Sequence, residues 1–192
     1  MQGFSLLEMM VVLAIALIIS GLALMSFQPT LKNSRVTNAY NTALGAMRQA
    51  RDFSIGQRQV YFVTFNANAT PPDTITVTQG GTGTVVATYP LPIDVRFLAQ
   101  SGLPTTGPDG FGAGNNAIDF DQGVAGGSKT VVYFMPDGSS QDVNGNLNSG
   151  VLYIAMNGDL YSSHAITVWA ATGRLRGWRL YNNAGVKYWR QM

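Results

Sequence analysis

The chain has 192 residues with a formal net charge of +2; 46% of the residues are hydrophobic, only 11% are charged, and cysteine is absent. The lack of cysteine excludes disulfides, thiolate metal sites and cysteine catalysis. The length leaves room for one domain of common size beside a long helix, and the 22 glycines with few charges favour an exported, β-rich domain over a cytosolic enzyme.

The first element is a long apolar run near the N-terminus. No residue from Met9 to Leu31 carries a charge. The run meets the roughly 20 apolar residues that a helix needs to cross about 30 Å of hydrocarbon, and in lipid its backbone is satisfied only as a helix. Glu8 stands at the edge of this run, and the next charge is Lys32. Because a carboxylate at membrane depth is costly, we expect Glu8 to have a partner outside its own segment.

The residues before this run resemble a known processing signal. Gly3-Phe4-Ser5-Leu6-Leu7-Glu8 is similar to the class III signal of type IV pilins and type II secretion pseudopilins. The resemblance implies that a prepilin peptidase cuts between Gly3 and Phe4 and methylates the new N-terminus at Phe4. It also implies that Glu8 pairs with the Phe4 amine of a neighbouring subunit when subunits stack into a filament.

Two simpler interpretations compete with this one: an ordinary signal anchor with a stray glutamate, and a secretory signal. A secretory signal should carry a basic n-region and a shorter apolar segment. Leaders of the family usually carry a basic residue, whereas Met1-Gln2-Gly3 has none. Either the true start lies upstream, or orientation depends on the N-terminal amine alone.

The helix is expected to continue beyond the apolar run. From Val36 to Ser54, apolar and small residues recur at three-and-four spacing, which predicts an amphipathic helix. We therefore expect a cleaved leader at residues 1–3, a transmembrane and filament-core helix at 4–28, and an amphipathic half of the same helix at 29–56.

The remaining residues, 57–192, are expected to form a β-rich head. β-branched and aromatic runs separated by turn residues predict strands at 60–65, 74–78, 84–88, 93–98, 117–120, 130–135, 150–156, 165–170 and 175–181. Residues 99–116 form the longest irregular stretch. The predicted fold class is α+β: a long N-terminal α-helix packed on an antiparallel β-sheet or β-sandwich-like head, as in pilins.

The C-terminal part of the chain narrows the resemblance. Phe134 to Ser139, the strand that opens at Gly150, and Thr172 to Arg176 together resemble the GspH/FimT pseudopilins. This resemblance implies a minor subunit of a type IV pilus or a type II secretion pseudopilus, near the tip. It would be anchored in the inner membrane by a single pass, with its head in the periplasm. The implied partners are other pilins through a helical filament core, the prepilin peptidase and the inner-membrane assembly platform.

Charge is distributed unevenly along the head. Residues 171–192 contain only basic charges, whereas residues 57–170 are mainly acidic. The basic residues of the first group are Arg174, Arg176, Arg179, Lys187 and Arg190; the second group holds Arg58, Arg96 and Lys129 against Asp73, Asp94, Asp109, Asp119, Asp121, Asp137, Asp142 and Asp159. This asymmetry indicates an anionic partner or an acidic neighbouring surface.

One basic element has a possible function of its own. In some FimT-like minor pilins, a Gly-Arg-x-Arg element is implicated in binding DNA for natural transformation, and this chain has one at residues 173–176. Two residues apart on a strand, Arg174 and Arg176 should project to one face with Trp178, and Arg179 to the other. We expect either DNA contact by these three arginines or, as the default, pairing with acids of adjacent subunits while Trp178 is in the core.

Enzymatic activity is not expected. His164 is the only histidine, and its sequence neighbours Ser162 and Ser163 do not indicate a catalytic pair, because such pairs meet through space. The glycine-rich residues 80–83 lack the lysine and the following helix of a phosphate-binding loop.

No cofactor is expected either. Residues 142–148 superficially suggest a calcium loop, but Gly145 is at the fourth position rather than the sixth, and Tyr153 occupies the twelfth, where a glutamate is expected. We therefore predict a solvated turn, with calcium as a weak alternative.

Overall fold

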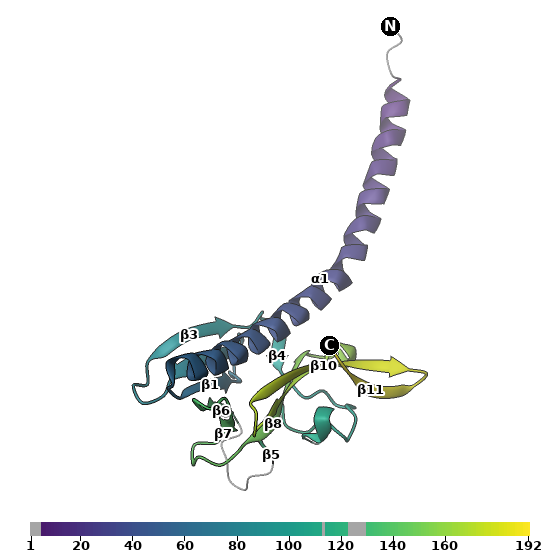
Figure 1. Ribbon diagram of the computed structural model, residues 1–192. Coiled ribbons are helices and arrows are strands. Elements are labelled where there is room, and N and C mark those ends of the chain that lie inside the picture. The colour runs from purple at the N-terminus through teal and green to yellow at the C-terminus, as the bar shows by residue number, and fades with distance from the viewer. Residues whose placement is uncertain (1–4, 113, 123–129) are drawn as a thin grey trace. The chain divides into compact units, whose positions relative to one another are not determined.

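The computed structural model describes residues 5–112, 114–122 and 130–192, and it consists of one long helix followed by antiparallel strands (Figure 1). Helix α1 (Leu6–Gln57) begins in a first unit, Met1–Ser34, and ends in a second unit, Arg35–Met192, which contains every described strand. The predicted α+β class, with a long N-terminal helix and an antiparallel β head, is confirmed.

In the first unit the helix exposes its apolar side chains. Leu6–Ala23 has a mean hydropathy of 2.5 and is 0% buried within the chain. By length and composition this segment can cross a membrane. Its side chains can leave water only against lipid or against other chains, because nothing in its own unit covers them.

In the second unit the helix is amphipathic, as predicted. The residues that point into the head recur at three-and-four spacing and are at most 3% exposed: Val36, Ala39, Tyr40, Ala43, Ala46, Met47 and Ala50. Alanines lie between the larger side chains of this stripe, so the helix can lie close to the strands beneath it.

The strands form two sheets. The five-stranded sheet has the order β3 (Val85–Pro90), β2 (Thr74–Gln79), β1 (Tyr61–Asn66), β6 (Val131–Phe134), β7 (Ser140–Gln141). The second sheet has the order β11 (Val186–Gln191), β10 (Arg174–Asn183), β9 (His164–Trp169), β8 (Ser149–Met156), β4 (Val95–Phe97), with β5 (Ile118–Gln122) also paired to β8. Two short 3₁₀ turns, η1 (Pro108–Gly110) and η2 (Leu160–Ser162), lie in the connections.

Two of these strands were missed in the sequence. β7 has only two residues, too few for any pattern. β11 is an exposed edge strand, so it lacks the alternation that a buried face imposes. Its hairpin turn carries positive φ at Ala184 (50°) and Gly185 (87°), which is the two-residue geometry usually signalled by Asn-Gly.

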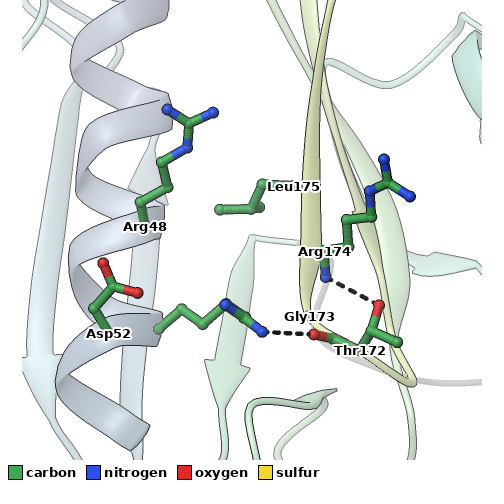
Figure 2. Close-up of a pocket in the computed structure, with 7 residues that line it drawn as sticks. Arg48, Asp52, Thr172, Gly173, Arg174 and Leu175 are labelled. Atoms are coloured by element: carbon green, nitrogen blue, oxygen red, sulfur yellow. Dashed lines mark hydrogen bonds between the residues drawn. The ribbon is translucent and has the colours of Figure 1, made fainter. Parts of the chain in front are cut away.

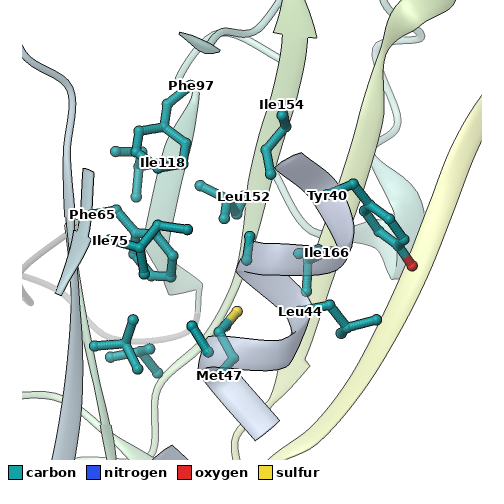
Figure 3. Close-up of a cluster of buried hydrophobic side chains, with 14 of the residues drawn as sticks. Tyr40, Leu44, Met47, Phe65, Ile75, Phe97, Ile118, Leu152, Ile154 and Ile166 are labelled. Atoms are coloured by element: carbon teal, nitrogen blue, oxygen red, sulfur yellow. The ribbon is translucent and has the colours of Figure 1, made fainter. Parts of the chain in front are cut away.

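One hydrophobic core joins the helix to both sheets (Figure 3). Met47 of α1 meets Phe65 and Ile75 from one sheet and Leu152 and Ile166 from the other. Gly177 permits the close approach of β10, since a Cβ there would lie 1.5 Å from the Tyr40 hydroxyl. The core therefore fixes β10 against the helix.

His164 lies buried beneath Tyr40, with their ring centroids 5.2 Å apart. Its Nδ1 lies 2.8 Å from the Ser162 carbonyl, to which it donates a hydrogen bond. Burial lowers the pKa of His164, and the nearby Arg179 charge acts in the same direction, whereas the hydrogen bond to Ser162 acts against them. The neutral imidazole is thus favoured in the folded state.

This environment predicts a pH-dependent stability. Above the unfolded pKa of about 6.5, His164 is neutral in both states and has no effect. Below it the unfolded chain binds the proton more readily, so the free energy of unfolding should fall as the pH drops below about 6.5. The loss is about 1.4 kcal/mol for each unit between the two pKa values. Urea unfolding of the full chain in detergent measures it; His164→Asn should flatten this part of the profile, and an unchanged slope would contradict the assignment.

Candidate functional site

The residues of the predicted processing site, Gly3 and Phe4, lie outside the described residues. Glu8 is described: it stands exposed in the first turn of α1, with apolar neighbours Leu7 (72% exposed) and Met9 (52% exposed). It forms no ion pair with any residue in the described part of the chain. A carboxylate is favoured at a helix N-terminus by the dipole, but in an apolar environment it still needs a counter-charge, which must come from outside this segment.

The turn between β9 and β10 carries the Gly-Arg-x-Arg element. Gly173 has φ +56°, and a Cβ there would lie 2.1 Å from the Gly138 carbonyl oxygen, so glycine is required in this turn on both counts. The turn is tied to the helix by Arg51, whose Nη2 donates to the Thr172 carbonyl at 3.1 Å (Figure 2). A hollow of about 520 Å³ lies between the helix and this turn, with Arg48 and Asp52 on its helical side.

The arginine of this element that faces solvent is Arg174. Figure 2 shows it across the strand from Leu175, which points toward the helix. Arg174 pairs in register with Trp169 of β9, which is 40% exposed, so the guanidinium and the indole occur on the same face of the sheet. Its side chain has no hydrogen-bond or ion-pair partner among the described residues.

The second arginine of the element has a partner within the chain. The Arg176 guanidinium donates to the Asp109 carboxylate at 2.7 Å, and Asp109 also accepts from the Thr167 hydroxyl at 2.5 Å. Trp178 donates from its indole to Thr167 at 3.0 Å and is partly buried. Arg176 therefore holds the turn η1 onto β9 and β10, in a network whose members are otherwise far apart in sequence.

The third predicted arginine, Arg179, lies on the opposite face of β10. Its guanidinium lies 5.6 Å from the ring centroid of Tyr181. Another cation of the C-terminal part, Lys187, donates to the Gly102 carbonyl at 2.8 Å. Arg176 and Lys187 thus hydrogen-bond to the loop that follows β4, whereas Arg174 and Arg179 do not.

Sequence reasoning missed the loop residue that captures Arg176. Asp109 sits at φ 58° inside an irregular stretch, 67 positions from its partner, and only the tertiary structure brings them together. The available signal was weak: an Asp within a Gly- and Pro-rich segment, which is common in ordinary turns.

The serine and histidine pair does not have the arrangement of a nucleophile and its base. The Ser162 hydroxyl donates to the Asp159 carbonyl at 2.6 Å and accepts from the Met156 amide at 2.9 Å. His164 contacts the carbonyl of Ser162 rather than its hydroxyl. Both groups therefore stabilise the connection between β8 and β9.

The segment compared with a calcium loop is a tight turn centred on Asp142. One carboxylate oxygen accepts from the amides of Asn144 (2.9 Å) and Asn146 (2.8 Å), and the other accepts from the Asn146 side chain at 3.3 Å. Within residues 5–112, 114–122 and 130–192, no group of three or more acidic or histidine side chains could hold a metal ion.

The N-terminal residues match a known family model. Residues 1–24 match the family described as the prokaryotic N-terminal methylation motif. The matched segment contains the exposed apolar stretch Leu6–Ala23, and antiparallel sheets follow the helix to which this stretch belongs.

A solved structure is also similar: the crystal structure of the type IV minor pilin FimU of Pseudomonas aeruginosa strain PAO1. The TM-score is 0.46 and the sequence identity 10%, and the match covers 84% of this chain and 96% of that one. Similarity at this level is too low to assign FimU's properties to this chain. No curated protein matches the sequence.

Proposed function

We propose that this chain is a structural minor pilin or pseudopilin of the GspH/FimT type. It is processed by a prepilin peptidase and built into a type IV pilus or a type II secretion pseudopilus, near the tip. The observation that carries the proposal is the continuous helix α1, which begins within the matched methylation motif, exposes an apolar Leu6–Ala23, and ends inside the core of a folded head.

The mechanism is one of assembly rather than catalysis. The apolar segment holds the subunit in the inner membrane, with the head in the periplasm, until the assembly platform adds it to a filament. There the same segment packs against the helices of other subunits. Cleavage after Gly3 creates an amine at Phe4, and Glu8 of the adjacent subunit neutralises it. Since two charges in an apolar environment are tolerated only as a pair, this contact sets the register between subunits.

Processing is tested by mass spectrometry of the mature chain. The expected N-terminal residue is Phe4 carrying one methyl group, and co-expression with an inactive prepilin peptidase should leave the residues before Phe4 attached. A mature chain that begins upstream of Phe4 in the presence of active peptidase would overturn the proposal.

A second candidate function is DNA binding by the head. The observation in its favour is the pairing of exposed Arg174 with half-exposed Trp169 on one face, since a guanidinium can bind phosphate and an indole can stack on a base. The engagement of Arg176 by Asp109 leaves this surface with few free cations, so we expect modest affinity and strong salt dependence.

Electrophoretic mobility of a short DNA with the full chain in detergent tests this function. The variant Arg174→Ala/Arg176→Ala should weaken a shift that is seen at low salt, and Trp169→Ala should weaken binding to single strands by about 1–3 kcal/mol. Arg58→Ala, which removes an exposed charge elsewhere, is the control. If the wild type gives no shift at low salt, the head does not bind DNA.

A further inference from the structure

The hairpin formed by β10 and β11 carries two arginines directly opposite each other. Arg179 pairs in register with Arg190, and Tyr181 with Tyr188, so all four side chains belong to one face. Both guanidinium groups lie over the ring of Tyr181, at 5.6 and 5.7 Å from its centroid. The two tyrosine rings stack with centroids 6.2 Å apart. We call these four residues the arginine–tyrosine patch.

Among the described residues, no ion pair neutralises the charge of this patch. Across the described ranges, neither Arg179 nor Arg190 forms an ion pair, and residues 171–192 contain no acid. Like charges directly opposite each other on a strand pair are destabilising. Contacts with the Tyr181 ring offset part of this repulsion. An external anion between the two guanidinium groups would remove the repulsion.

One tyrosine of the patch, Tyr188, is exposed, whereas Tyr181 is partly buried. Tyr188 is 40% exposed, and Tyr161 beside the hairpin is 44% exposed. A hollow of about 230 Å³ separates Tyr161 from Arg179 and Tyr181. Tyrosine combines an apolar ring with a polar tip, which suits the boundary between water and lipid.

The position of the patch within the head also matters. Leu175 lines the same hollow as Arg48, and Gly177 lies against Tyr40. Strand β10 therefore runs along α1 in the opposite chain direction, from the level of residue 48 toward Arg35. Arg179 and Tyr181 continue in that direction. The patch therefore lies toward the end of the second unit that holds Arg35, the first residue of that unit, and twelve positions along the chain separate Arg35 from Ala23, the last residue of the apolar segment.

We propose that the arginine–tyrosine patch binds the phosphate groups of an anionic phospholipid surface. This inference rests on the proposed membrane-anchored function, which holds the head beside such a surface before assembly. The guanidinium group of arginine can donate paired hydrogen bonds to phosphate oxygens, and basic residues near an anionic membrane are attracted to it. The tyrosines would rest at the level of the headgroups. Nucleic acid offers the same phosphate chemistry but is not tethered to the chain, so the lipid surface is favoured.

Hydrogen exchange of the full chain in lipid nanodiscs tests this inference. Two disc compositions are compared: phosphatidylcholine alone, and phosphatidylcholine with 30% phosphatidylglycerol. Exchange within residues 179–190 should slow by about tenfold in the anionic discs, given the attraction of two arginines. High salt should reverse the change, because the Debye length shrinks to about 3 Å at 1 M.

Two double variants make the comparison specific. Arg179→Gln/Arg190→Gln should abolish the protection by anionic lipid. Arg48→Gln/Arg58→Gln removes the same charge from exposed positions outside the hairpin, and it should retain the protection. Equal loss in both variants would show that net charge alone is responsible, which would overturn the proposal. Unchanged exchange in β1 and β2 confirms that each variant remains folded.

Two further outcomes separate this inference from its premise. Protection of residues 6–23 without any lipid-dependent change at 179–190 would overturn the inference and leave anchoring intact, whereas exchange of 6–23 as fast as in an unfolded chain would overturn anchoring itself. Protection of 179–190 by an added oligonucleotide in neutral discs, without a response to phosphatidylglycerol, would assign the patch to nucleic acid and contradict the proposal.

Discussion

Replacing Glu8 by alanine is expected to leave the protein in the membrane and to lower its incorporation into filaments by about 100-fold. The apolar segment Leu6–Ala23 retains all of its hydrophobic side chains, so insertion should be preserved or improved. In a filament, however, the amine of Phe4 in the neighbouring subunit would be left without its counter-charge. Leaving one member of a buried pair unpaired costs about 3–5 kcal/mol, which corresponds to two or more powers of ten.

The measurement is the ratio of filament-bound to membrane-bound subunit, with Glu8→Asp and Glu8→Gln compared alongside Glu8→Ala. Aspartate keeps the charge and should restore part of the incorporation, whereas glutamine keeps the size but not the charge and should behave like alanine. Asp52→Ala removes an exposed carboxylate from the head and serves as the control. Normal incorporation of Glu8→Gln would show that the charge of this residue has no part in assembly.

The elements of the fold were predictable because their signals are local. An uncharged run of more than 20 residues, three-and-four spacing beyond it, and short β-branched runs between turns each depend on neighbouring residues only. β11 escaped prediction because an exposed edge strand buries no face, so Val186 to Gln191 shows no period. How the strands divide between two sheets depends on pairings that no local pattern carries.

The candidate site residues also differ in whether the sequence alone could identify them. Glu8 was identifiable because a charge at the edge of an apolar run is unusual wherever the chain folds. The state of Arg176 was not, since its partner Asp109 comes from an irregular loop. The opposition of Arg179 and Arg190 required the register of β11, a strand that the sequence did not reveal. Residue type therefore predicted which groups can carry function, whereas tertiary pairing decided which of them remain free.

The surroundings of Asp73 determine how much its ion pair contributes to the stability of the head. Its carboxylate lies 2.9 Å from the Arg96 guanidinium, and the Asp94 carboxylate lies at the same distance from Arg35. The side chain of Asp73 is 0% exposed, whereas those of Arg35 and Asp94 are 55% and 31% exposed. Asp73 also accepts from the amides of Asn68 (3.0 Å) and Phe97 (2.9 Å), so it joins the loop before β2 to strand β4.

We therefore expect Asp73→Ala to lower the free energy of unfolding by about 3 kcal/mol, because it leaves two amides without an acceptor and removes the carboxylate that neutralises the partly buried Arg96 guanidinium. Asp94→Ala should cost less than about 1 kcal/mol, since solvent replaces the lost partner of an exposed pair. Urea unfolding of both variants in detergent, at equal m-values, provides the comparison. Equal losses would mean that the distance between the charges, rather than burial and the additional hydrogen bonds, decides what such a pair contributes. With the larger loss at Asp73, the loop before β2 and strand β4 are joined by a buried charge whose partners come from two segments, the loop at Asn68 and strand β4. Disruption of this charge should loosen the head at the edge of the sheet that carries β4.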